Sequence, residues 1–434
     1  MSKAKHSVAI IGCGVSGMAA ALELDNKFDV TIYEATDRIG GRATTVYDKT
    51  LDENLDNGQH ICIGAYKVFL NFLKKIGSDD KFIITKKYNI PYYYNGKIHS
   101  LTSKLFSGKF GLLEAILTDS NISIKEKLYA IAFAIKLQMN SIRLEKYDDC
   151  KDLLTSQKQS EKIIAILWEP LIVSTMNTPV WKADPRVFAN IMIDGFLSKS
   201  ENAAFYLPTT HFGELFSNFV STFKSVVNCR RALLLNNPIK KIEKFENMFV
   251  VDGETYDSVI ITTPSFITKR LLETTSYDVN TPQYSPIVSI YFWLDQSLLE
   301  AEMMSLPQTK FDWLFNRTKL MNLDEGDFSY QITTSAADEM AKISDSKIIE
   351  LINAELSKVF NLEIRIEKYK IIREKMATFL ADRKSCDNRP KVKTHINGLY
   401  IAGDYPQNNY PSTLEGAAIN GVKAAHYIQQ YNSK

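Results

Sequence analysis

The chain has 434 residues, which is too long for one hydrophobic core of ordinary size, so at least two domains are expected. Apolar residues make up 45% of it and charged residues 24%, as in a folded globular protein. The net charge is +2 and the pI is about 8.0, which excludes the strongly basic field of a nucleic-acid-binding protein. The five cysteines are scattered without any Cys-x-x-Cys pair, which predicts a reduced compartment and no metal site.

The hydrophobic pattern predicts no membrane-spanning segment. The N-terminus passes into a strand within a few residues, so no secretory signal is expected. No apolar run reaches the roughly 18–20 residues that span a bilayer. We therefore expect a cytoplasmic protein that is soluble or that lies on the inner face of the membrane.

The most informative pattern stands at the start of the chain. An apolar strand, Val8–Ile11, runs into a turn with Gly12, Gly14 and Gly17, and an alanine-rich helix follows. The first glycine permits a tight turn, the second lets backbone approach a pyrophosphate, and the third allows close packing of helix on strand. The free N–H groups at the start of this helix attract phosphate. This strand–turn–helix unit predicts a dinucleotide site.

A second strand, Val30–Tyr33, ends on Glu34, the position at which a carboxylate accepts hydrogen bonds from a ribose. An acid at this position argues against a 2′-phosphate on the ligand. Arg38, Gly40, Gly41 and Arg42 follow almost at once. This extension resembles the flavin amine oxidase and phytoene desaturase superfamily, in which the equivalent of Arg42 meets the pyrophosphate. The resemblance implies FAD rather than NAD, although Asn26-Lys27 replaces a glycine that is usual between the first helix and second strand.

The next part of the chain predicts helices with an apolar and a basic side. A motif from Leu55 to Tyr66 passes into a helix that ends near Leu73, and Tyr88–Tyr94 is typical of a strand. A long helix is expected over Ile122–Leu144. Spacings of three and four bring five apolar side chains to one of its sides: Leu128, Ile131, Ala132, Ile135 and Met139. Lysines are frequent from residue 97 to 145, which predicts contact with a membrane surface or, alternatively, an ordinary solvated face.

Short strands are expected over Ala232–Leu235, Ile239–Ile242, Phe249–Val251 and Val259–Thr263, with turns at Asn236-Asn237 and Asp252-Gly253. Two-dinucleotide-fold flavoproteins insert such a meander before returning to their central sheet. A second strand-rich region follows, with strands expected at Val288–Leu294, Asp312–Phe315, Phe328–Thr333 and Glu363–Arg373, and a helix at Ser346–Phe360.

The chain closes on a strand that ends in Gly403-Asp404, followed by Thr413-Leu414-Glu415-Gly416-Ala417 and a final helix. This resembles the closing FAD motif of the superfamily, in which the aspartate holds the ribityl-phosphate region. The helix N-terminus then faces the flavin pyrimidine and stabilises negative charge there. Distant parts of the sequence are thus expected to meet around one FAD.

The predicted fold is an α/β two-dinucleotide-binding-domain flavoprotein. Its Rossmann-like FAD domain is discontinuous (residues 1–84, 208–285 and 392–434), and an α+β substrate domain fills 85–207 and 286–391. The residues expected to bind FAD are Gly12, Gly14, Val15, Ser16, Gly17, Glu34, Ala35, Arg38, Gly40, Gly41, Arg42, Gly58, Gln59, His60, Ile239, Thr263, Gly403, Asp404, Thr413, Leu414, Glu415 and Ala417.

Interior strings resemble one branch of the superfamily, the hydroxysqualene dehydroxylases. They extend in order over nearly the whole chain: Asp56–His60, Gly64–Tyr66, Trp168–Leu171, Asn177–Pro179, Tyr206–Pro208, Trp313–Arg317, Glu374–Phe379 and Arg389-Pro390. Tyr405-Pro406 and Tyr410 depart from the residues usual in that family. Because these positions border the flavin, they put the substrate geometry in doubt but leave the cofactor assignment intact.

The resemblance implies that reduced FAD delivers hydride to the carbocation left when hydroxysqualene loses water, giving squalene for hopanoid biosynthesis. Such a reaction needs an apolar tunnel, a proton for the leaving hydroxyl and exclusion of water. His60 is the leading candidate for the proton donor, because histidine donates near neutral pH. Lesser candidates are Tyr66, Glu169 and Asn177. The aromatic residues expected to line the tunnel are Phe196, Phe205, Tyr206, Tyr291, Phe292, Trp293 and Trp313.

Three alternatives stay open. A carotenoid-type desaturase shares the fold, the cofactor and a long isoprenoid substrate, but removes hydrogen. A flavin amine oxidase usually has an aromatic residue two positions before the Glu-Gly-Ala turn, where this chain has Thr413. A non-catalytic flavin-binding scaffold is disfavoured because Arg42, Asp404 and the helix-starting turn are all retained. The electron donor that reduces FAD is not identifiable from sequence.

Overall fold

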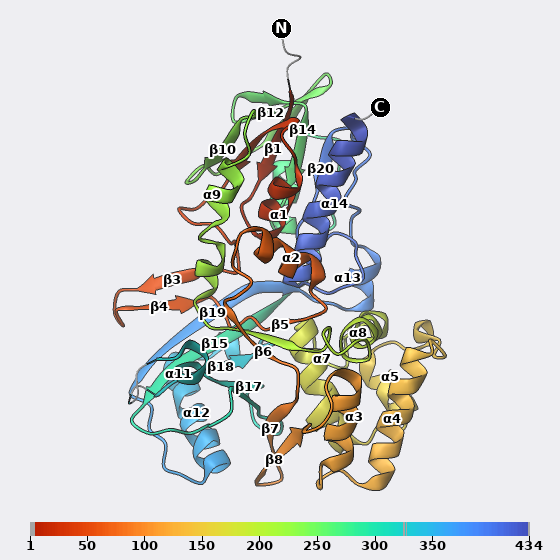
Figure 1. Cartoon of the computed structure of the whole chain (residues 1–434), viewed down its shortest axis with the longest axis vertical. Coiled ribbons are helices and arrows are strands. Elements are labelled where there is room, and N and C mark those ends of the chain that lie inside the picture. The colour runs from red at the N-terminus through yellow and green to blue at the C-terminus, as the bar shows by residue number, and fades with distance from the viewer. Residues whose placement is uncertain (1–4, 324–325, 327, 433–434) are drawn as a thin grey trace.

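The computed structural model describes residues 5–323, 326 and 328–432. In the upper half of Figure 1, five strands form a parallel sheet in the order β10-β2-β1-β14-β20. Their bounds are β1 (His6–Ile11), β2 (Phe28–Tyr33), β10 (Arg231–Leu234), β14 (Ser258–Ile261) and β20 (Leu399–Ile401). The central strands are near-continuous apolar runs, as expected where helices and loops cover both faces of a parallel sheet.

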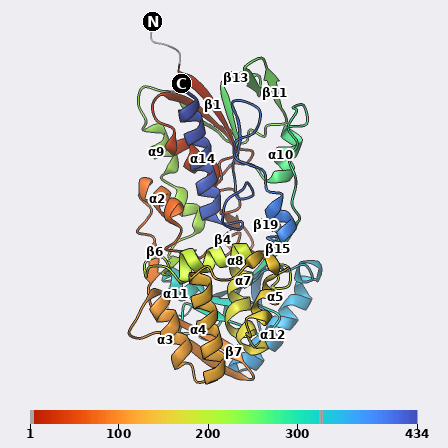
Figure 2. The same ribbon diagram turned by 90° about the vertical axis from the view of Figure 1, so that its right-hand side faces the viewer.

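The first and last helices lie side by side on this sheet, although nearly 400 residues separate them. Helix α1 (Val15–Glu23) packs along α14 (Leu414–Asn432), as Figures 1 and 2 show. Contact is so close that a side chain at Gly421 would lie 2.1 Å from the Ser16 carbonyl oxygen. The C-terminal segment is therefore an integral part of the dinucleotide fold.

Smaller elements surround the parallel sheet. Strands β11 (Ile242–Phe245), β12 (Met248–Val251) and β13 (Glu254–Tyr256) form an antiparallel meander. Two further small sheets pair β3 (Thr45–Asp48) with β4 (Glu53–Asp56), and β9 (Phe205–Pro208) with both β5 (Cys62–Ile63) and β6 (Phe82–Thr85). The accompanying helices are α2 (Lys67–Lys75), η4 (Phe212–Phe216), α9 (Phe219–Lys224), α10 (Ser265–Leu271) and α13 (Arg383–Asp387).

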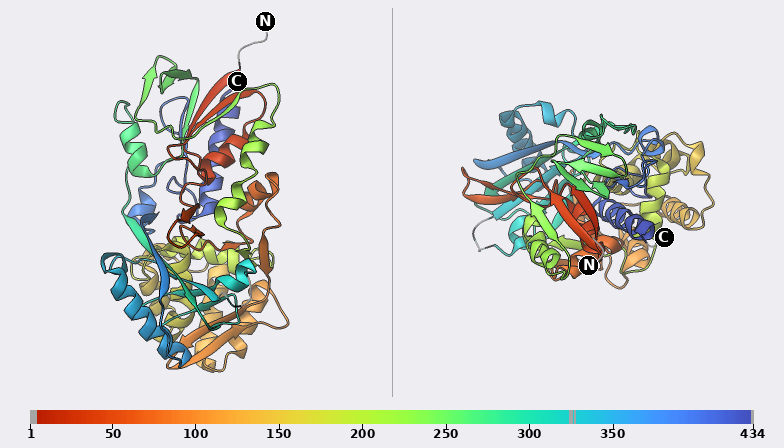
Figure 3. Two further views of the ribbon diagram at one scale, coloured as in Figure 1. Left: turned by 90° about the vertical axis from the view of Figure 1, so that its left-hand side faces the viewer. Right: turned by 90° about the horizontal axis from the view of Figure 1, so that it is seen from above.

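The lower half contains a mixed seven-stranded sheet in the order β19-β15-β18-β17-β16-β7-β8. Its strands are β7 (Asn89–Tyr94), β8 (Lys97–Thr102), β15 (Tyr284–Leu294), β16 (Met303–Ser305), β17 (Trp313–Asn316), β18 (Phe328–Thr334) and β19 (Lys368–Phe379). Its accompanying helices are α11 (Arg317–Met321), η5 (Met340–Lys342) and α12 (Asp345–Phe360). The left view of Figure 3 shows this sheet and α12 below the parallel sheet.

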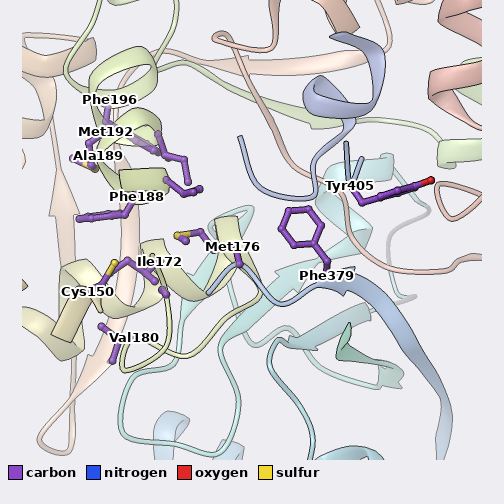
Figure 4. Close-up of a cluster of buried hydrophobic side chains, with 14 of the residues drawn as sticks. Cys150, Ile172, Met176, Val180, Phe188, Ala189, Met192, Phe196, Phe379 and Tyr405 are labelled. Atoms are coloured by element: carbon purple, nitrogen blue, oxygen red, sulfur yellow. The ribbon is translucent and has the colours of Figure 1, made fainter. Parts of the chain in front are cut away.

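Helices form the rest of the lower half and face the viewer in Figure 2. They are α3 (Gly108–Thr118), α4 (Ile124–Gln138), η1 (Leu144–Lys146), α5 (Cys150–Ser156), α6 (Glu161–Ile163), η2 (Ile164–Trp168), α7 (Glu169–Met176), α8 (Pro185–Ile191) and η3 (Met192–Phe196). Segments η2 and η3 are π-helical, a conformation frequent at functional sites. Figure 4 shows part of the core between α7, α8 and η3, with Phe379 and Tyr405 at its edge.

Three sequence predictions were wrong at element boundaries. The helix expected over Ile122–Leu144 ends at Gln138, and Asn140 then adopts a left-handed conformation. The strand expected from Ile239 begins only at Ile242. The strand expected over Glu363–Arg373 begins at Lys368 and continues to Phe379, because Ser357 and Asn353 side chains, rather than a neighbouring strand, bind the N–H groups of Ile364 and Ile366.

The predicted α/β class with a parallel, Rossmann-like sheet is confirmed, whereas the residue boundaries proposed for the two domains remain a prediction. The five parallel strands all fall within the ranges assigned to the FAD domain. Across the described part of the chain, every helix is too short or too polar to cross a bilayer.

Candidate functional site

A cavity of about 660 Å³ extends from the turn after β1, between the two halves of the molecule, to helix α3. At one end its lining carries backbone and polar groups from both termini of the chain. At the other end it is lined mainly by apolar side chains from α3, η2, η3 and the mixed sheet.

The glycines of the first turn have the roles that their spacing predicts. Gly12 has a φ of +105°, and its N–H donates to the Tyr33 carbonyl at 2.7 Å. A side chain at Gly17 would lie 2.1 Å from the Gly12 carbonyl oxygen, so only glycine lets helix α1 start this close to the strand. Gly14 and Gly41 lie opposite each other in the lining, and no side chain fills the space beside them. Such bare backbone fits a pyrophosphate.

Glu34 lies at the end of β2 and lines the cavity. Its carboxylate accepts the Cys13 N–H at 2.8 Å and both the N–H and hydroxyl of Thr36 at 2.9–3.0 Å. These bonds fix the carboxylate beside the glycine turn. A fixed acid in this position fits a ribose hydroxyl.

Arg42 and Asp404 form the charged pair of the cofactor end. The Arg42 guanidinium donates to Asp404 Oδ1 at 2.6 Å and to the Ala377 carbonyl at 2.7 Å. Burial would raise the pKa of Asp404, but the Arg42 charge and hydrogen bonds from Arg42 and Ser412 outweigh it, so the pKa is lowered. Asp404 is therefore ionised at neutral pH and joins the start of the chain to its closing motif.

The loop after Asp404 is organised by Arg389, which the sequence predictions included only within an Arg-Pro string. Its buried guanidinium donates to five carbonyl groups, those of Asp404, Tyr405, Pro406, Asn408 and Tyr410. Burial lowers its pKa to about 10, which still leaves it charged. No sequence pattern pairs Arg389 with these carbonyls, because the contacts are to backbone.

Helix α14 begins at the cavity, where Thr413, Leu414 and Ala417 line it. The Thr413 hydroxyl accepts the Gly416 N–H at 3.1 Å. Glu415 turns away and accepts the N–H groups of Val68 and Phe69 at the start of α2. Burial raises its pKa to about 7 in spite of these two bonds. Glu415 thus holds α2 rather than lining the cavity.

Two of the predicted catalytic residues, His60 and Tyr66, line the cavity near this helix. Burial and, second, the Arg42 charge lower the pKa of His60 to about 4, so its imidazole is neutral at pH 7. Its ring packs against Phe212 at a centroid distance of 4.7 Å. Burial raises the pKa of Tyr66, which is hydrogen-bonded to Thr413. Neither residue holds a readily released proton at neutral pH.

Glu169 is the first residue of α7 and Asn177 caps its C-terminal end, and the two have different surroundings. The Asn177 amide donates to the Ser285 carbonyl at 3.0 Å and the Thr378 hydroxyl at 2.9 Å, and accepts the Ala336 N–H at 2.6 Å. It lines the cavity, but these bonds use its amide to join α7 to the mixed sheet. Glu169 is half-buried, and burial raises its pKa. Of the four predicted catalytic residues, Glu169 alone is missing from the described lining.

The apolar end is partly as predicted. Of the aromatic residues expected in a tunnel, Phe196, Phe205 and Trp313 line the cavity, together with Trp168 and Phe315. Tyr291 instead lies 4.9 Å beneath the Arg317 guanidinium, and Phe292 stacks on Tyr330. Because successive side chains of β15 point to opposite faces of the sheet, Trp293 shares the contact of Tyr291 with Arg317, and neither face of this part of β15 contributes to the lining. Tyr206 packs on Phe82 and is also absent from the lining.

One polar pair in the lining was missed by the sequence predictions. The Tyr410 hydroxyl donates to Asp194 Oδ2 at 2.9 Å, and both residues line the cavity. Asp194 lies in the π-helical segment η3, and Tyr410 lies in the loop that Arg389 holds. The residues are 216 positions apart, so no local motif announces the pair.

The cavity brings together nearly all residues predicted to bind the cofactor. Among the described residues, those absent from its lining are Gly17, Arg38 and Glu415. Gly17 acts through helix packing, and exposed Arg38 pairs with Asp37 at 3.2 Å. No group of described residues gathers the ligands that a metal ion needs.

Comparison with known proteins gives the family. The sequence profile of the flavin containing amine oxidoreductases matches residues 15–429, and the chain belongs to this family. It is 24% identical to the hydroxysqualene dehydroxylase of Zymomonas mobilis over 96% of this chain and 97% of that protein. It is also 24% identical to a chloroplastic/chromoplastic 15-cis-phytoene desaturase of an Oncidium hybrid, over 98% and 78%. An oxidoreductase structure from Methanosarcina mazei superposes with a TM-score of 0.72 and 16% identity, covering 97% and 100% of the two chains.

The protein is therefore an FAD-dependent oxidoreductase. The bare backbone at Gly14 and Gly41, the N-terminus of α1 and the acid at Glu34 fit the dinucleotide part of FAD.

Proposed function

We propose that this chain reduces a long isoprenoid alcohol and, specifically, that it converts hydroxysqualene to squalene. The observation that carries the proposal is the cavity, because apolar lining continues directly from the cofactor end to α3. A hydrocarbon chain gains free energy wherever such a lining removes it from water. The end-to-end similarity to a hydroxysqualene dehydroxylase supports the same substrate class.

The residues at the cofactor end bind and orient FAD. The first-turn backbone and the start of α1 receive the pyrophosphate, Glu34 the ribose, and Arg42 with Asp404 the region between phosphate and flavin. Reduced FAD supplies the hydride that the reaction consumes. The amides at the start of α14 favour negative charge on the neighbouring part of the ligand.

We assign orientation of the leaving hydroxyl to the Asp194–Tyr410 pair. Loss of the hydroxyl as water takes up one proton from the medium, and the substrate is left as an allylic cation that takes up hydride. Tyr410 donates to Oδ2 of Asp194, which leaves Oδ1 to hold the leaving hydroxyl. The oxygens of Asp194 also stabilise the cation beside them. Ring faces of Trp168, Phe196 and Phe205 add cation–π stabilisation.

The other candidates receive supporting roles. Neutral His60 lines the pocket without supplying the proton, and Tyr66 with Thr413 shapes the pocket beside the flavin. Asn177 holds α7 on the sheet. Glu169 takes no part in proton transfer in this scheme.

A 15-cis-phytoene desaturase activity is the second candidate, because similarity to such enzymes also covers almost the whole chain. It needs oxidised FAD and a substrate without a leaving hydroxyl. The Asp194–Tyr410 pair favours the dehydroxylase, because a hydrocarbon substrate has no hydroxyl for the pair to hold. An amine oxidase is disfavoured by Thr413 and by the length of the apolar lining.

The test is a single turnover without oxygen. Dithionite-reduced holoenzyme is mixed with hydroxysqualene, and squalene is measured together with oxidation of the flavin. One squalene per flavin oxidised is expected. The proposal is overturned if the flavin stays reduced while the oxidised enzyme converts phytoene or an amine.

A further inference from the structure

Large apolar side chains are exposed together on α3, on the loop before it and on α4. Nine of them fall between residues 98 and 139: Ile98, Leu105, Phe106, Phe110, Leu117, Ile124, Leu128, Ile135 and Met139. Leu105 and Ile124 are 76% and 78% exposed, so their side chains add little hydrophobic stabilisation to the fold. Helices α3 and α4 lie at the opposite end of the molecule from α14 (Figures 1 and 2).

The apolar residues of α4 form one stripe, and that stripe faces outward. Ile124, Leu128, Ile131, Ile135 and Met139 follow each other at spacings of three and four, which places them along one side of the helix. Its opposite side is the buried one and carries Ala130, Phe133 and Leu137. Phe133 packs edge-on against Trp168 of the core at 5.3 Å. Helix α4 is therefore apolar on both sides, although only one side has a partner among the described residues.

The charge around these residues is positive. Residues 97–139 contain six lysines and three acidic residues, in a chain whose total charge is only +2. The acids are engaged locally. Glu114 accepts N–H groups of residues 104–106, Glu126 caps α4 and pairs with Lys162, and buried Asp119 accepts the Tyr92 hydroxyl. Lys97, Lys104, Lys125 and Lys136 are exposed.

Helix α3 lies between this surface and the cavity. Leu112 and Ala115 line the cavity, whereas Phe110 and Leu117 of the same helix are exposed. Phe110 and Phe106 lie with ring centroids 6.5 Å apart, and Lys109 lies over the Phe110 ring. Helix α3 alone thus separates these exposed apolar side chains from the apolar lining of the cavity.

We propose that residues 97–139 dock on an anionic lipid bilayer and that the isoprenoid passes between bilayer and cavity at α3. The nine exposed side chains, which we term the docking surface, enter the acyl boundary, while the lysines around them meet anionic headgroups. Electrostatic attraction alone does not explain exposed Phe and Leu, and a second protein copy does not explain the lysine excess. The passage of substrate rests on the proposed function, but the docking does not.

The test is co-sedimentation of the holoenzyme with vesicles free of isoprenoid, either phosphatidylcholine alone or with phosphatidylglycerol. Wild type should partition at least about tenfold more strongly onto the anionic vesicles. Phe106→Ser with Phe110→Ser, Ile124→Ser and Leu128→Ser should lose binding to both. Lys104→Glu with Lys125→Glu and Lys136→Glu should lose only the preference for anionic lipid. The matched control, Val227→Ser with Phe245→Ser, alters exposed apolar residues outside the docking surface and should bind like wild type.

Flavin content and thermal unfolding establish that each variant is folded. Turnover of detergent-dispersed substrate should be unchanged in the serine variant, so failure of docking and failure of the proposed reaction are separate outcomes. The proposal is overturned if wild type ignores both vesicles, if control and serine variants lose binding equally, or if the serine changes only convert a dimer to a monomer.

Discussion

At the cofactor end of the cavity, specific polar contacts fix the positions of the side chains and loops, and each contact depends on one particular residue. Arg42 donates to Asp404 and a carbonyl, Arg389 donates to five carbonyls, and Gly12 and Gly17 leave no room for a side chain. At the α3 end the lining is apolar, and many side chains of similar size serve equally well there. The first end recognises one ligand atom by atom, whereas the second selects a class of ligand by its surface. Single substitutions should therefore have large effects at the cofactor end and small effects at the α3 end.

The largest effect is expected for Arg42→Ala. This change leaves the buried Asp404 carboxylate without its partner, which should lower the free energy of unfolding by about 3–5 kcal/mol and abolish flavin retention. Urea unfolding and the flavin-to-protein absorbance ratio measure both. Arg38→Ala, an exposed arginine four positions away, is the control and should cost less than about 0.5 kcal/mol. Equal effects of the two changes on stability and flavin retention would contradict a specific role for the Arg42–Asp404 pair.

Asp194→Asn should come next, because it tests the one carboxylate that we place between the two ends. Loss of a carboxyl oxygen that holds the leaving hydroxyl and stabilises the cation should lower kcat by about 10²-fold or more at unchanged flavin content. Tyr410→Phe removes only the hydrogen bond to Oδ2 and should cost about tenfold. Single-turnover rates with hydroxysqualene provide the measurement. Wild-type rates in Asp194→Asn would contradict the assignment.

Glu415 gives a stability effect with a defined sign. Burial raises its pKa from 4.5 to about 7, so the folded state favours the neutral acid. Its contribution to stability is complete below pH 4.5 and is lost as the pH rises to about 7. The stability of wild type relative to Glu415→Gln should therefore fall over this window, by at most ~3 kcal/mol. Exposed Glu161→Gln serves as control, and a difference that is constant with pH would refute the shift.

The smallest effect is expected for His60→Gln. A pKa of about 4 means that the imidazole carries no proton to deliver at pH 7. We expect about a tenfold loss in kcat or less, from altered positioning, and a pH profile of the same shape as wild type. If wild type shows an inflection near pH 6.5 that His60→Gln lacks, His60 supplies the proton to the leaving hydroxyl after all.

The sequence predicted features that depend on residues near each other in the chain better than features that depend on distant residues. The glycines at 12, 14 and 17 were assigned correctly to turn, bare backbone and helix packing, because each acts on residues close in the chain. The helix period of α4 was visible too, since it depends on spacing alone. Its outward direction was not, because that depends on Trp168 packing against the other side.

Residues that act across long separations escaped prediction. Arg389, Asp194 and Gly421 contact groups that sequence order does not bring near them. Glu415 was predicted to bind the cofactor, yet it is absent from the cavity lining and accepts the N–H groups of Val68 and Phe69 at the start of α2. The start of β19 was misjudged because Ile364 and Ile366 have the apolar alternation of a strand but bond to helix side chains.

The packing of α14 on α1 also bears on biosynthesis. A ribosome releases residues 1–100 long before it makes Asp404 and the helix that follows, so the dinucleotide cradle stays open until α14 has been made. Nascent chains and released fragments that lack α14 are then expected to be colourless. Flavin uptake would thereby mark chains that have reached this helix.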